Sequence, residues 1–443
     1  MKMKNHIYIP IEILVREINP KILFSYHAAL NNYRVYIGTK TGIDKIVKKK
    51  INYKKSGIYF YKSQIISNRK YIKKIKKVFE KFVVLDEELG VGVANIQYSL
   101  EKRGRNLHDI DKFFVIGKKM MLHLLNFDKY FKKISSITGW LKYDIYRKKN
   151  IKLLSSETEE IKTKYGDFYL FSSNYGALSN QGLNARMKLD KKLKKFKNSK
   201  NTKNNYFTFK NSISDFKYLK KSLFKFLIKN PKFKLILRPH PADKLIEDWK
   251  VFDQFENVKV IKKYDIVPWI LASKGLIHRG CTTSIDAYFL NKPAYYFLPN
   301  RKVINSEKNL AYKISKKIKS FENLNGIKKK IFKNDSIINK EIYLKRPAHE
   351  IIIKELKKIN ITKEKKINFT FYENFKYYFF PFFGNLKLSF IKFFLGKNIH
   401  DNLKIPAFIK KKELIEKINS INNNKFKINI REVTREVFEI EKI

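Results

Sequence analysis

The chain has 443 residues, of which 44% are hydrophobic and 15% are aromatic, and it contains a single cysteine. A chain of this length is expected to form two domains, and its apolar content is sufficient to bury two cores, which excludes an intrinsically disordered protein. One cysteine excludes disulfide bonds within the chain and any zinc site built from several cysteines.

The formal net charge is +56 at pH 7. Dense lysine can neutralise phosphates, but lysine, isoleucine and asparagine are enriched along the whole chain, and no helix-turn-helix, zinc-finger or RNA-binding pattern accompanies the charge. We therefore expect no specific nucleic-acid partner. A basic surface of this kind attracts anionic membranes and acidic polysaccharides.

No stretch of about twenty residues is free of charge, which argues against a transmembrane helix. Residues 1–6 lead directly into a short predicted strand, without the apolar core of a signal peptide. The expected location is the cytoplasm, with peripheral binding to the inner face of the cytoplasmic membrane as a further expectation.

The N-terminal part of the chain begins with a predicted strand at 7–11, a helical periodicity from Pro20 to Leu30 and a second strand at 34–38. Proline is favoured in the first turn of a helix, so Pro20 predicts the start of this helix. The order strand, helix, strand is typical of a Rossmann-like domain.

Carboxylates follow two predicted strands of this domain. Glu12 ends the first strand, where it could act as a general base; the alternative is a helix-capping carboxylate or one in an ion pair with Arg16. Glu87 and Glu88 follow a strand at 82–85 and are further candidates for the base.

Gly139 and Asn174 mark the passage from the first domain to the second. Gly139 lies where the first domain ends, and glycine there permits a hinge, a close backbone approach or simply a turn. A strand at 168–172 then opens into a polar loop, in which Asn174 is predicted to face the cleft between the domains.

Two strand ends of the second domain carry the residues expected to bind an anion. The strand at 233–237 stops at Arg238-Pro239-His240-Pro241, where two prolines hold Arg238 and His240 in a stiff loop. A strand at 275–278 is followed by small hydroxyl residues and a helix at 285–290. Such a turn offers backbone N–H groups and positive potential to a phosphate, and ligands of open α/β sheets bind at this edge.

Together these segments resemble the bacterial surface carbohydrate biosynthesis proteins, which belong with the GT-B-type glycosyltransferases, the CDP-glycerol glycerophosphotransferases and the UDP-N-acetylglucosamine 2-epimerases. The matching residues are Pro10-Ile11-Glu12, Arg16-Glu17, Thr138, Gly139 and Asp144 in the first domain, and Arg238-Pro239-His240-Pro241, His278, Cys281-Thr282-Thr283, Asp286-Ala287 and Lys292-Pro293 in the second. Two positions depart from the family pattern, which usually has serine at Cys281 and glutamate at Asp286.

The resemblance implies an α/β fold of two Rossmann-like domains facing a cleft, as in GT-B enzymes. We expect an acceptor domain at 1–150, a nucleotide-donor domain at 151–330 and a helical, basic and aromatic C-terminal extension at 331–443. Within the second domain a returning helix is predicted at 311–318. Within the extension, residues 369–395 predict either an interfacial membrane segment or a helical pair packed on the protein.

The resemblance also implies roles for single residues. His240 is expected to be catalytic, together with Glu12, Glu87 or Glu88. A set of residues at the two strand ends is expected to bind the nucleotide and its phosphates: Arg238, His278, Cys281, Thr282, Thr283, Ser284 and Asp286. In the resembling enzymes, the acid at the position of Asp286 meets the ribose hydroxyls of the nucleotide. The residues expected at the cleft or hinge are Arg16, Gly139 and Asn174.

We therefore expect a metal-independent transferase of surface polysaccharide or lipopolysaccharide biosynthesis, with no cofactor. It would move a sugar or polyol phosphate from a nucleotide-activated donor to a glycan or lipid-linked acceptor. One alternative is an enzyme resembling the UDP-sugar 2-epimerases, which would release an altered nucleotide sugar instead of free nucleotide. Another is a non-catalytic protein that binds polysaccharide or nucleic acid through its basic surface.

Overall fold

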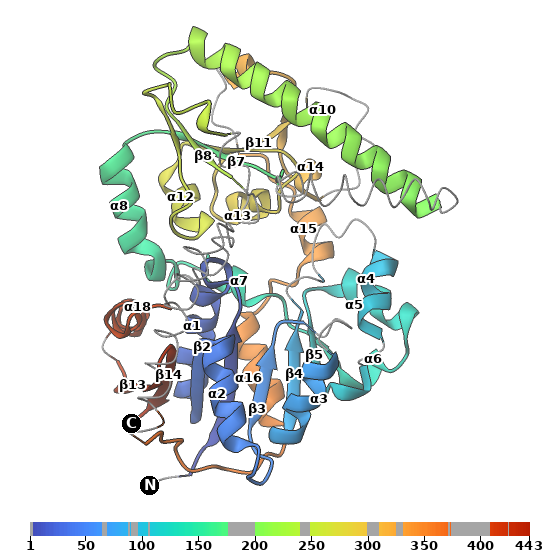
Figure 1. Ribbon diagram of the computed structural model, residues 1–443, viewed down its shortest axis with the longest axis vertical. Coiled ribbons are helices and arrows are strands. Elements are labelled where there is room, and N and C mark those ends of the chain that lie inside the picture. Colours follow the sequence, from blue (N-terminus) through green and yellow to red (C-terminus); the bar gives the residue numbers. More distant parts are fainter. Residues whose placement is uncertain are drawn as a thin grey trace, which may run out of the picture. The chain divides into compact units, whose positions relative to one another are not determined.

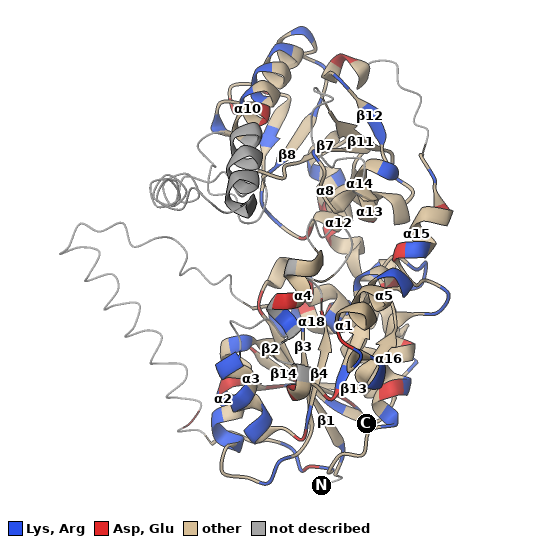
Figure 2. Cartoon of the chain, turned by 90° about the vertical axis from the view of Figure 1, so that its right-hand side faces the viewer, with Lys and Arg blue, Asp and Glu red and all other residues tan. Residues whose placement is uncertain are grey.

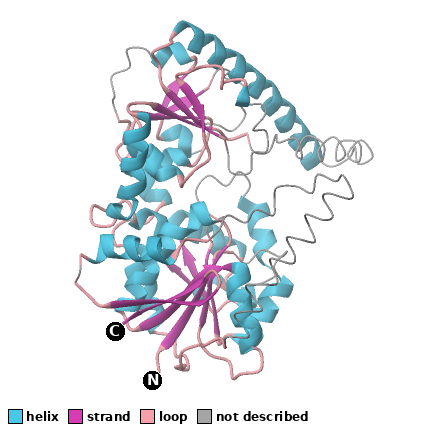
Figure 3. Ribbon diagram, turned by 60° about the vertical axis from the view of Figure 1, so that its left-hand side comes forward, coloured by secondary structure: helices cyan, strands magenta, loops and turns pink. Residues whose placement is uncertain are grey.

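The computed structural model describes residues 3–63, 69–86, 89, 96–104, 107–175, 200–239, 249–298, 310–324, 331–370, 373, 408–423 and 425–443. Contacts divide the chain into two compact units, one made of Met1–Leu153 with Ile338–Ile443 and the other of Leu154–Ile337. In Figure 1 the first unit therefore contains both the blue and the red elements. Each unit has its own sheet flanked by helices (Figure 3), which confirms the prediction of an α/β fold with two sheet-containing domains.

Unit 1 is built on a sheet whose strand order, in the described residues, is β13-β14-β2-β1-β3-β4-β5-β6. Its strands are β1 (Asn5–Ile11), β2 (Tyr33–Thr39), β3 (Ile58–Tyr61), β4 (Lys81–Leu85), β5 (Lys112–Val115), β6 (Ser135–Ile137), β13 (Ile428–Thr434) and β14 (Val437–Lys442). Its helices include α1 (Leu14–Leu30), α2 (Lys40–Lys50), α3 (Arg69–Val78), α4 (Ile96–Gly104), α5 (Lys118–Phe127), α6 (Phe131–Ile134), α7 (Leu141–Asp144), α16 (Ala348–Lys357) and α18 (Lys411–Asn422). Strands β1 to β6 are parallel, and the antiparallel hairpin β13–β14 joins the sheet beside β2.

The central strands of unit 1 are buried on both faces, β1 from His6 to Ile11 and β2 over its whole length. Strands buried in this way need apolar residues at successive positions instead of alternate ones. The runs Ile7-Tyr8-Ile9 and Val35-Tyr36-Ile37 provide them, which is why the sequence predicted both strands.

Helix α1 begins at Leu14, so the prediction of a start at Pro20 was wrong. The Glu17 carboxylate accepts hydrogen bonds from the backbone N–H groups of Glu12 (3.1 Å) and Ile13 (3.0 Å). These bonds satisfy donors at and just before the N-terminus of the helix, in the manner of a capping box. The cap fixes the earlier start, and Pro20 lies inside the helix.

Residues 338–443 belong to unit 1, which differs from the prediction of a separate C-terminal extension. The junction is made at the first turn of α16, where Asp144 accepts hydrogen bonds from the backbone N–H groups of Ala348 and His349, both at 2.9 Å. The same carboxylate lies 2.8 Å from Nδ1 of His349. A buried acid at a helix N-terminus satisfies free N–H groups and interacts favourably with the helix dipole.

Gly139 allows the returning chain to pass close to the end of β6. Its φ angle is +80°, and a Cβ atom there would lie 2.5 Å from the carbonyl oxygen of Tyr343. Both the positive φ and the close approach require glycine. Gly139 and Asp144 thus form a place at which the C-terminal part of the chain docks on the N-terminal part.

The hairpin β13–β14, which the sequence analysis did not predict, closes one side of the sheet of unit 1. Glu441 of β14 accepts hydrogen bonds from Arg34 of β2, at 3.1 Å from Nε and 2.9 Å from Nη2. Lys4 lies 3.2 Å from the same carboxylate. Charged residues at alternate positions of β14 interrupt its apolar pattern, so a search for apolar runs does not find the strand. The acids among them are buried in ion pairs.

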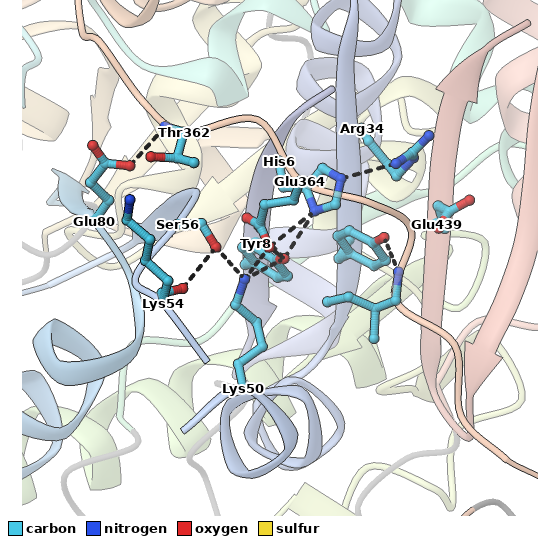
Figure 4. A network of polar contacts seen from close by, with 12 residues as sticks. His6, Tyr8, Arg34, Lys50, Lys54, Ser56, Glu80, Thr362, Glu364 and Glu439 are labelled. Carbon is cyan, nitrogen blue, oxygen red and sulfur yellow. Dashed lines mark hydrogen bonds and ion pairs between the residues drawn. The ribbon is translucent and has the colours of Figure 1, made fainter. Parts of the chain in front are cut away.

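A network of buried polar side chains joins the segment around Glu364 to β1 (Figure 4). Glu364 accepts hydrogen bonds from Lys50 and Tyr8, and its Oε2 atom lies 3.6 Å from Nδ1 of His6. The backbones of Lys4 and Glu364 also pair, at 3.2 and 2.9 Å. Burial, with the charge of Arg34, lowers the pKa of His6 to about 2, so His6 is neutral at neutral pH.

Unit 2 contains a parallel sheet with the order β12-β11-β10-β7-β8-β9. Its strands are β7 (Tyr169–Ser172), β8 (Leu235–Arg238), β9 (Val258–Val260), β10 (Gly275–His278), β11 (Ala294–Phe297) and β12 (Lys316–Ile318). Its helices include α8 (Ser155–Tyr165), α10 (Lys200–Lys229), α12 (Ile266–Ala272), α13 (Thr283–Phe289) and α14 (Leu310–Lys313), and α15 (Asp335–Glu341) leads back to unit 1.

The prediction of a helix at 311–318 was wrong for its second half. The helix α14 ends at Lys313, and Lys316–Ile318 form strand β12, which pairs with β11. Among the helices that the structure describes, none combines the length and the apolar character that a membrane-spanning helix needs. The predicted interfacial segment 369–395 lies outside the described residues, apart from 369, 370 and 373.

The Asp144 cap predicts a large effect on stability. Asp144→Ala leaves two buried N–H groups of α16 without an acceptor, and we expect it to lower the free energy of unfolding by about 2–4 kcal/mol. Urea unfolding followed by circular dichroism measures this loss. Asp253→Ala, at an exposed aspartate of unit 2, is the control; equal midpoints for the two variants would contradict a role for Asp144 in docking.

Candidate functional site

Three neighbouring strands of unit 2 end together at one edge of its sheet. Ser172 of β7 pairs with Arg238 of β8 on one side and with His278 of β10 on the other. The backbone N–H of Ser173 donates to the carbonyl of Arg238 at 3.0 Å, which continues the pairing past the strands. The predicted residues of the two strand ends are therefore brought to one level of one sheet.

The turn between β10 and α13 is held against the end of β7. Asn174 donates from Nδ2 to the carbonyl of Gly280 at 3.3 Å, and Ser172 Oγ lies 3.9 Å from Cys281 Sγ. Gly280 has a φ of +68°, and a Cβ atom there would lie 2.9 Å from the hydroxyl of Tyr296. Glycine is therefore required for the turn to lie this close to the sheet.

The hydroxyl residues of the turn have different surroundings. Thr282 is exposed and precedes α13, but its backbone is already helical and its side chain makes no cap hydrogen bond. Ser284 is buried and donates from Oγ to the carbonyl of Cys281 at 2.9 Å. The Oγ1 atom of Thr283 is buried and has no hydrogen-bond partner within the described residues.

Arg238 is buried beneath this edge of the sheet. Its guanidinium donates to the backbone carbonyls of Lys263 and Tyr264, the latter at 2.8 Å, and lies 5.3 Å from the ring centroid of Trp269. Burial lowers the pKa of Arg238 to about 10, although the charge of Asp265 opposes this shift. Arg238 thus stays charged at neutral pH, and its described contacts fix the loop before α12.

His278 is fully buried. Its Nε2 atom lies 2.9 Å from Ser315 Oγ, and Nδ1 has no partner in the described part of the chain. Burial, together with the charge of Arg279, lowers the pKa of His278 to about 3. A neutral imidazole gives no positive charge to a phosphate, so the structure supports only a hydrogen-bonding role for this residue.

An ion pair behind the turn was missed by the sequence analysis. Arg279 binds Asp215 of α10 through Nε (2.8 Å) and Nη2 (3.1 Å), and Tyr175 donates to the same aspartate at 2.7 Å. A bidentate pair of this kind fixes orientation as well as charge. The two residues are far apart in the sequence, so no local pattern could have indicated the pair. Asp286, the predicted ribose ligand, is buried on α13.

In unit 1, Glu12 lies at the carboxyl end of β1 inside a cluster of cations. It accepts hydrogen bonds from Lys40 (2.9 Å) and Tyr61 (2.5 Å) and forms an ion pair with Lys62 (3.0 Å). Lys62 also binds Glu17 at 2.9 Å. The structure thus favours an ion pair over a free base, but its partners are Lys40 and Lys62 instead of the predicted Arg16, which is exposed.

The electrostatics of this cluster follow from its contacts. Burial alone would raise the pKa of Glu12, but hydrogen bonds from Tyr61 and Lys40 and the charge of Lys62 outweigh it and lower the pKa to about 2. Such a carboxylate is ionised at neutral pH and is a weak base. Glu12 is therefore suited to holding Lys40 and Lys62 in place.

Three predicted catalytic residues, Glu87, Glu88 and His240, lie outside the described residues. Their neighbour Asp86 is described, and it binds Arg103 through both carboxylate oxygens, at 2.6 and 3.1 Å. Within the described ranges no group of three or more His, Cys, Asp or Glu residues could hold a metal ion.

No protein-family model matches this sequence, and no curated protein matches it either. A comparison with solved structures found similar chains. The UDP-GlcNAc 2-epimerase of Methanocaldococcus jannaschii in complex with UDP-GlcNAc and UDP is 12% identical, with a TM-score of 0.49 over 80% of this chain and 100% of that chain. The UDP-GlcNAc 2-epimerase of Neisseria meningitidis bound to UDP-GlcNAc is 13% identical, with a TM-score of 0.47 over 81% and 100%.

A second kind of enzyme is found among the similar structures. A variant of the wall teichoic acid polymerase TagF, soaked with CDPG, is 12% identical, with a TM-score of 0.46 over 81% of this chain and 89% of that chain.

The low pKa of Glu12 predicts a specific dependence of stability on pH. Because the folded pKa of about 2 lies below the ordinary 4.5, the ionised carboxylate stabilises the fold above about pH 4.5, and this contribution is lost as the pH falls toward 2. We expect Glu12→Gln to lower the free energy of unfolding by about 2 kcal/mol at pH 7 and by progressively less toward pH 2. Urea unfolding across this range measures both curves.

Glu159→Gln is the control, because the side chain of Glu159 is 69% exposed. Its curve should run parallel to that of the unmodified protein. If the free energy of unfolding of Glu12→Gln differed from that of the unmodified protein by the same amount at every pH, the ion-pair assignment would be contradicted.

Proposed function

We propose that unit 2 binds the diphosphate of a nucleotide-activated donor at the turn between β10 and α13. We further propose that the protein transfers a sugar or polyol phosphate from this donor to a glycan or lipid-linked acceptor in surface polysaccharide biosynthesis. It would use neither a metal ion nor a further cofactor. The base for the acceptor hydroxyl would be Glu87, Glu88 or His240.

The observation that supports the donor site is the combination of exposure and rigidity at one turn. Thr282 is exposed and Cys281 and Thr283 are half-buried, while Gly280 is tied to Asn174 and Ser284 to the carbonyl of Cys281. At the start of α13 the N–H groups of Ser284 and Ile285 donate to the carbonyls of Cys281 (3.2 Å) and Thr282 (2.9 Å), so the N–H groups that precede them are the ones a ligand would use. A pre-formed turn of this kind binds phosphate oxygens with little loss of conformational freedom.

The surroundings of the turn fit an anionic ligand. Arg238 remains charged beneath the same edge of the sheet and contributes positive potential, which the nearby charge of Asp265 reduces, and the charge of Arg279 is balanced by Asp215. At the developing charge of a leaving phosphate, preorganised donors of this type contribute most to rate. The motif pattern that resembles surface carbohydrate enzymes is densest around this turn.

A charge placed at Thr282 tests the donor site. We expect Thr282→Glu to fold as stably as the unmodified protein, because an acid at the start of a helix is favourable. It should weaken binding of the recognised nucleotide at least tenfold, because the carboxylate would repel the phosphates. Thermal unfolding with CMP, CDP, UMP, UDP and GDP measures binding, since a ligand at about one hundred times its Kd stabilises the fold by about 2.7 kcal/mol.

Thr163→Glu makes the same charge change at an exposed threonine of α8 and is the control. Selective stabilisation by one nucleotide, lost in Thr282→Glu and kept in Thr163→Glu, would support the site and name the donor class. Equal binding by both variants would contradict it.

The fate of the nucleotide separates the alternative functions. A transferase releases free nucleotide when given donor and acceptor, whereas a 2-epimerase returns an altered sugar still attached to its nucleotide. A non-catalytic protein would bind no nucleotide selectively, and its affinity for polyanions would fall steeply with salt. Chromatography of the reaction products, combined with the binding series, distinguishes these outcomes.

A further inference from the structure

One edge of the sheet of unit 1 carries exposed apolar side chains among lysines. It is the amino-terminal edge, opposite to the edge at which Glu12 lies. Asn5 pairs with Tyr33 at the start of β1 and β2, and Val35 pairs with Ile440, which places the last residues of β14 at the same level. Lys4 accordingly donates from Nζ to the carbonyl of Lys442, at 2.7 Å.

Three segments meet at this edge. Residues 51–57 connect α2 to β3, residues 425–427 precede β13, and residues 361–366 are fixed there by the pairing of Lys4 with Glu364. Ile428 at the start of β13 pairs with Lys442, so residues 425–427 lie just beyond the edge at which β1 and β2 start. We call the exposed apolar residues and lysines of these segments the amino-edge surface: Ile51, Tyr53, Lys54, Lys55, Lys363, Lys365, Lys425, Phe426 and Lys427.

The apolar members of this surface are strongly exposed. Tyr53 is 66% exposed, Ile51 46% and Phe426 40%. Folded proteins seldom leave large apolar side chains this open in neighbouring segments without a partner. Each of the three is flanked in sequence by lysine within two residues.

The charge of the amino-edge surface is positive and unopposed within its own segments. All six of its lysines are exposed. The acids nearby include Glu364, Glu441 and Glu80. Glu364 is held in an ion pair with Lys50 and Glu441 in one with Arg34, and Glu80 accepts a hydrogen bond from the backbone N–H of Thr362 at 2.8 Å. Figure 2, with Lys and Arg in blue, shows that α2 and α3, which lead to this edge, are largely basic as well.

We propose that the amino-edge surface binds an anionic lipid membrane. Lysines near an anionic bilayer contribute about 1 kcal/mol each, and aromatic and aliphatic side chains between them enter the interface of head groups and acyl chains. The aliphatic Ile51 favours lipid over nucleic acid, because bases stack on aromatic rings but gain little from an exposed isoleucine. This proposal does not depend on the proposed donor site.

The described start of the aromatic segment lies beside the same surface. Lys49, in the last turn of α2, forms an ion pair with Glu373 at 2.6 Å and lies 4.8 Å from the ring centroid of Phe369. Phe369 is the first residue of the stretch that the sequence predicts to be interfacial. Its position places the beginning of that stretch next to the amino-edge surface, although the surface is complete without it.

Vesicle flotation of the full chain tests the proposal. The unmodified protein should bind vesicles of phosphatidylcholine with about 30% phosphatidylglycerol at physiological salt and should bind pure phosphatidylcholine at least tenfold more weakly. Tyr53→Ser combined with Phe426→Ser should lower the partition coefficient for the anionic vesicles at least tenfold. Both positions are exposed, so thermal unfolding should be unchanged.

A matched control replaces two equally exposed apolar side chains elsewhere, Leu122 (60% exposed) on α5 and Tyr218 (47%) on α10. Leu122→Ser with Tyr218→Ser should bind vesicles as the unmodified protein does. Undiminished binding by the Tyr53 and Phe426 variant, or equal loss in the control, would overturn the proposal. So would a tenfold loss of affinity for single-stranded RNA with vesicle binding kept, which would identify a nucleic-acid surface instead.

Discussion

The hydrogen bonds between Asp144 and the start of α16 are the constraint on which unit 1 depends. They join a turn near the end of the N-terminal segment to the first residues that return after unit 2. Gly139 leaves room for the returning backbone, and the buried carboxylate meets N–H groups that would otherwise be unsatisfied. The junction thus fixes the start of α16, the first helix of the returning segment that lies wholly in unit 1.

A second constraint is the scarcity of acids, since 40 acidic residues face 96 lysines and arginines. Several of the acids lie in buried pairs, among them Glu17, Asp86, Asp215, Glu364 and Glu441. A buried ion pair is costly to break from one side, because it leaves the other charge uncompensated. The surface therefore carries a large excess of exposed lysine. The interior of this strongly basic chain can still be compact, because the charges within it are paired.

Sequence reasoning succeeded where structure is local. Several buried strands of both units were predicted because parallel strands covered on two faces need continuous apolar runs, as at Ile7-Tyr8-Ile9, although the buried strand β3 was missed. It failed where an element depends on contacts that no apolar pattern shows. The start of α1 depends on the hydrogen bond from the backbone N–H of Ile13 to the Glu17 carboxylate. The strands of the hairpin β13–β14 depend on their pairing with β2. The turn at Gly280 was predicted, but not the neutral, buried state of His278, because burial is a property of the completed fold.

The insertion of unit 2 between the two parts of unit 1 determines the order in which the protein can be completed during synthesis. Strand β2 is translated before unit 2, yet its partner β14 is translated after unit 2. Until then β2 is an uncovered sheet edge, which is open to pairing with other chains. Unit 2 can fold from a continuous segment in the meantime, so the nascent chain would hold a finished domain beside an unfinished one, and the unfinished one is where chaperones would be needed.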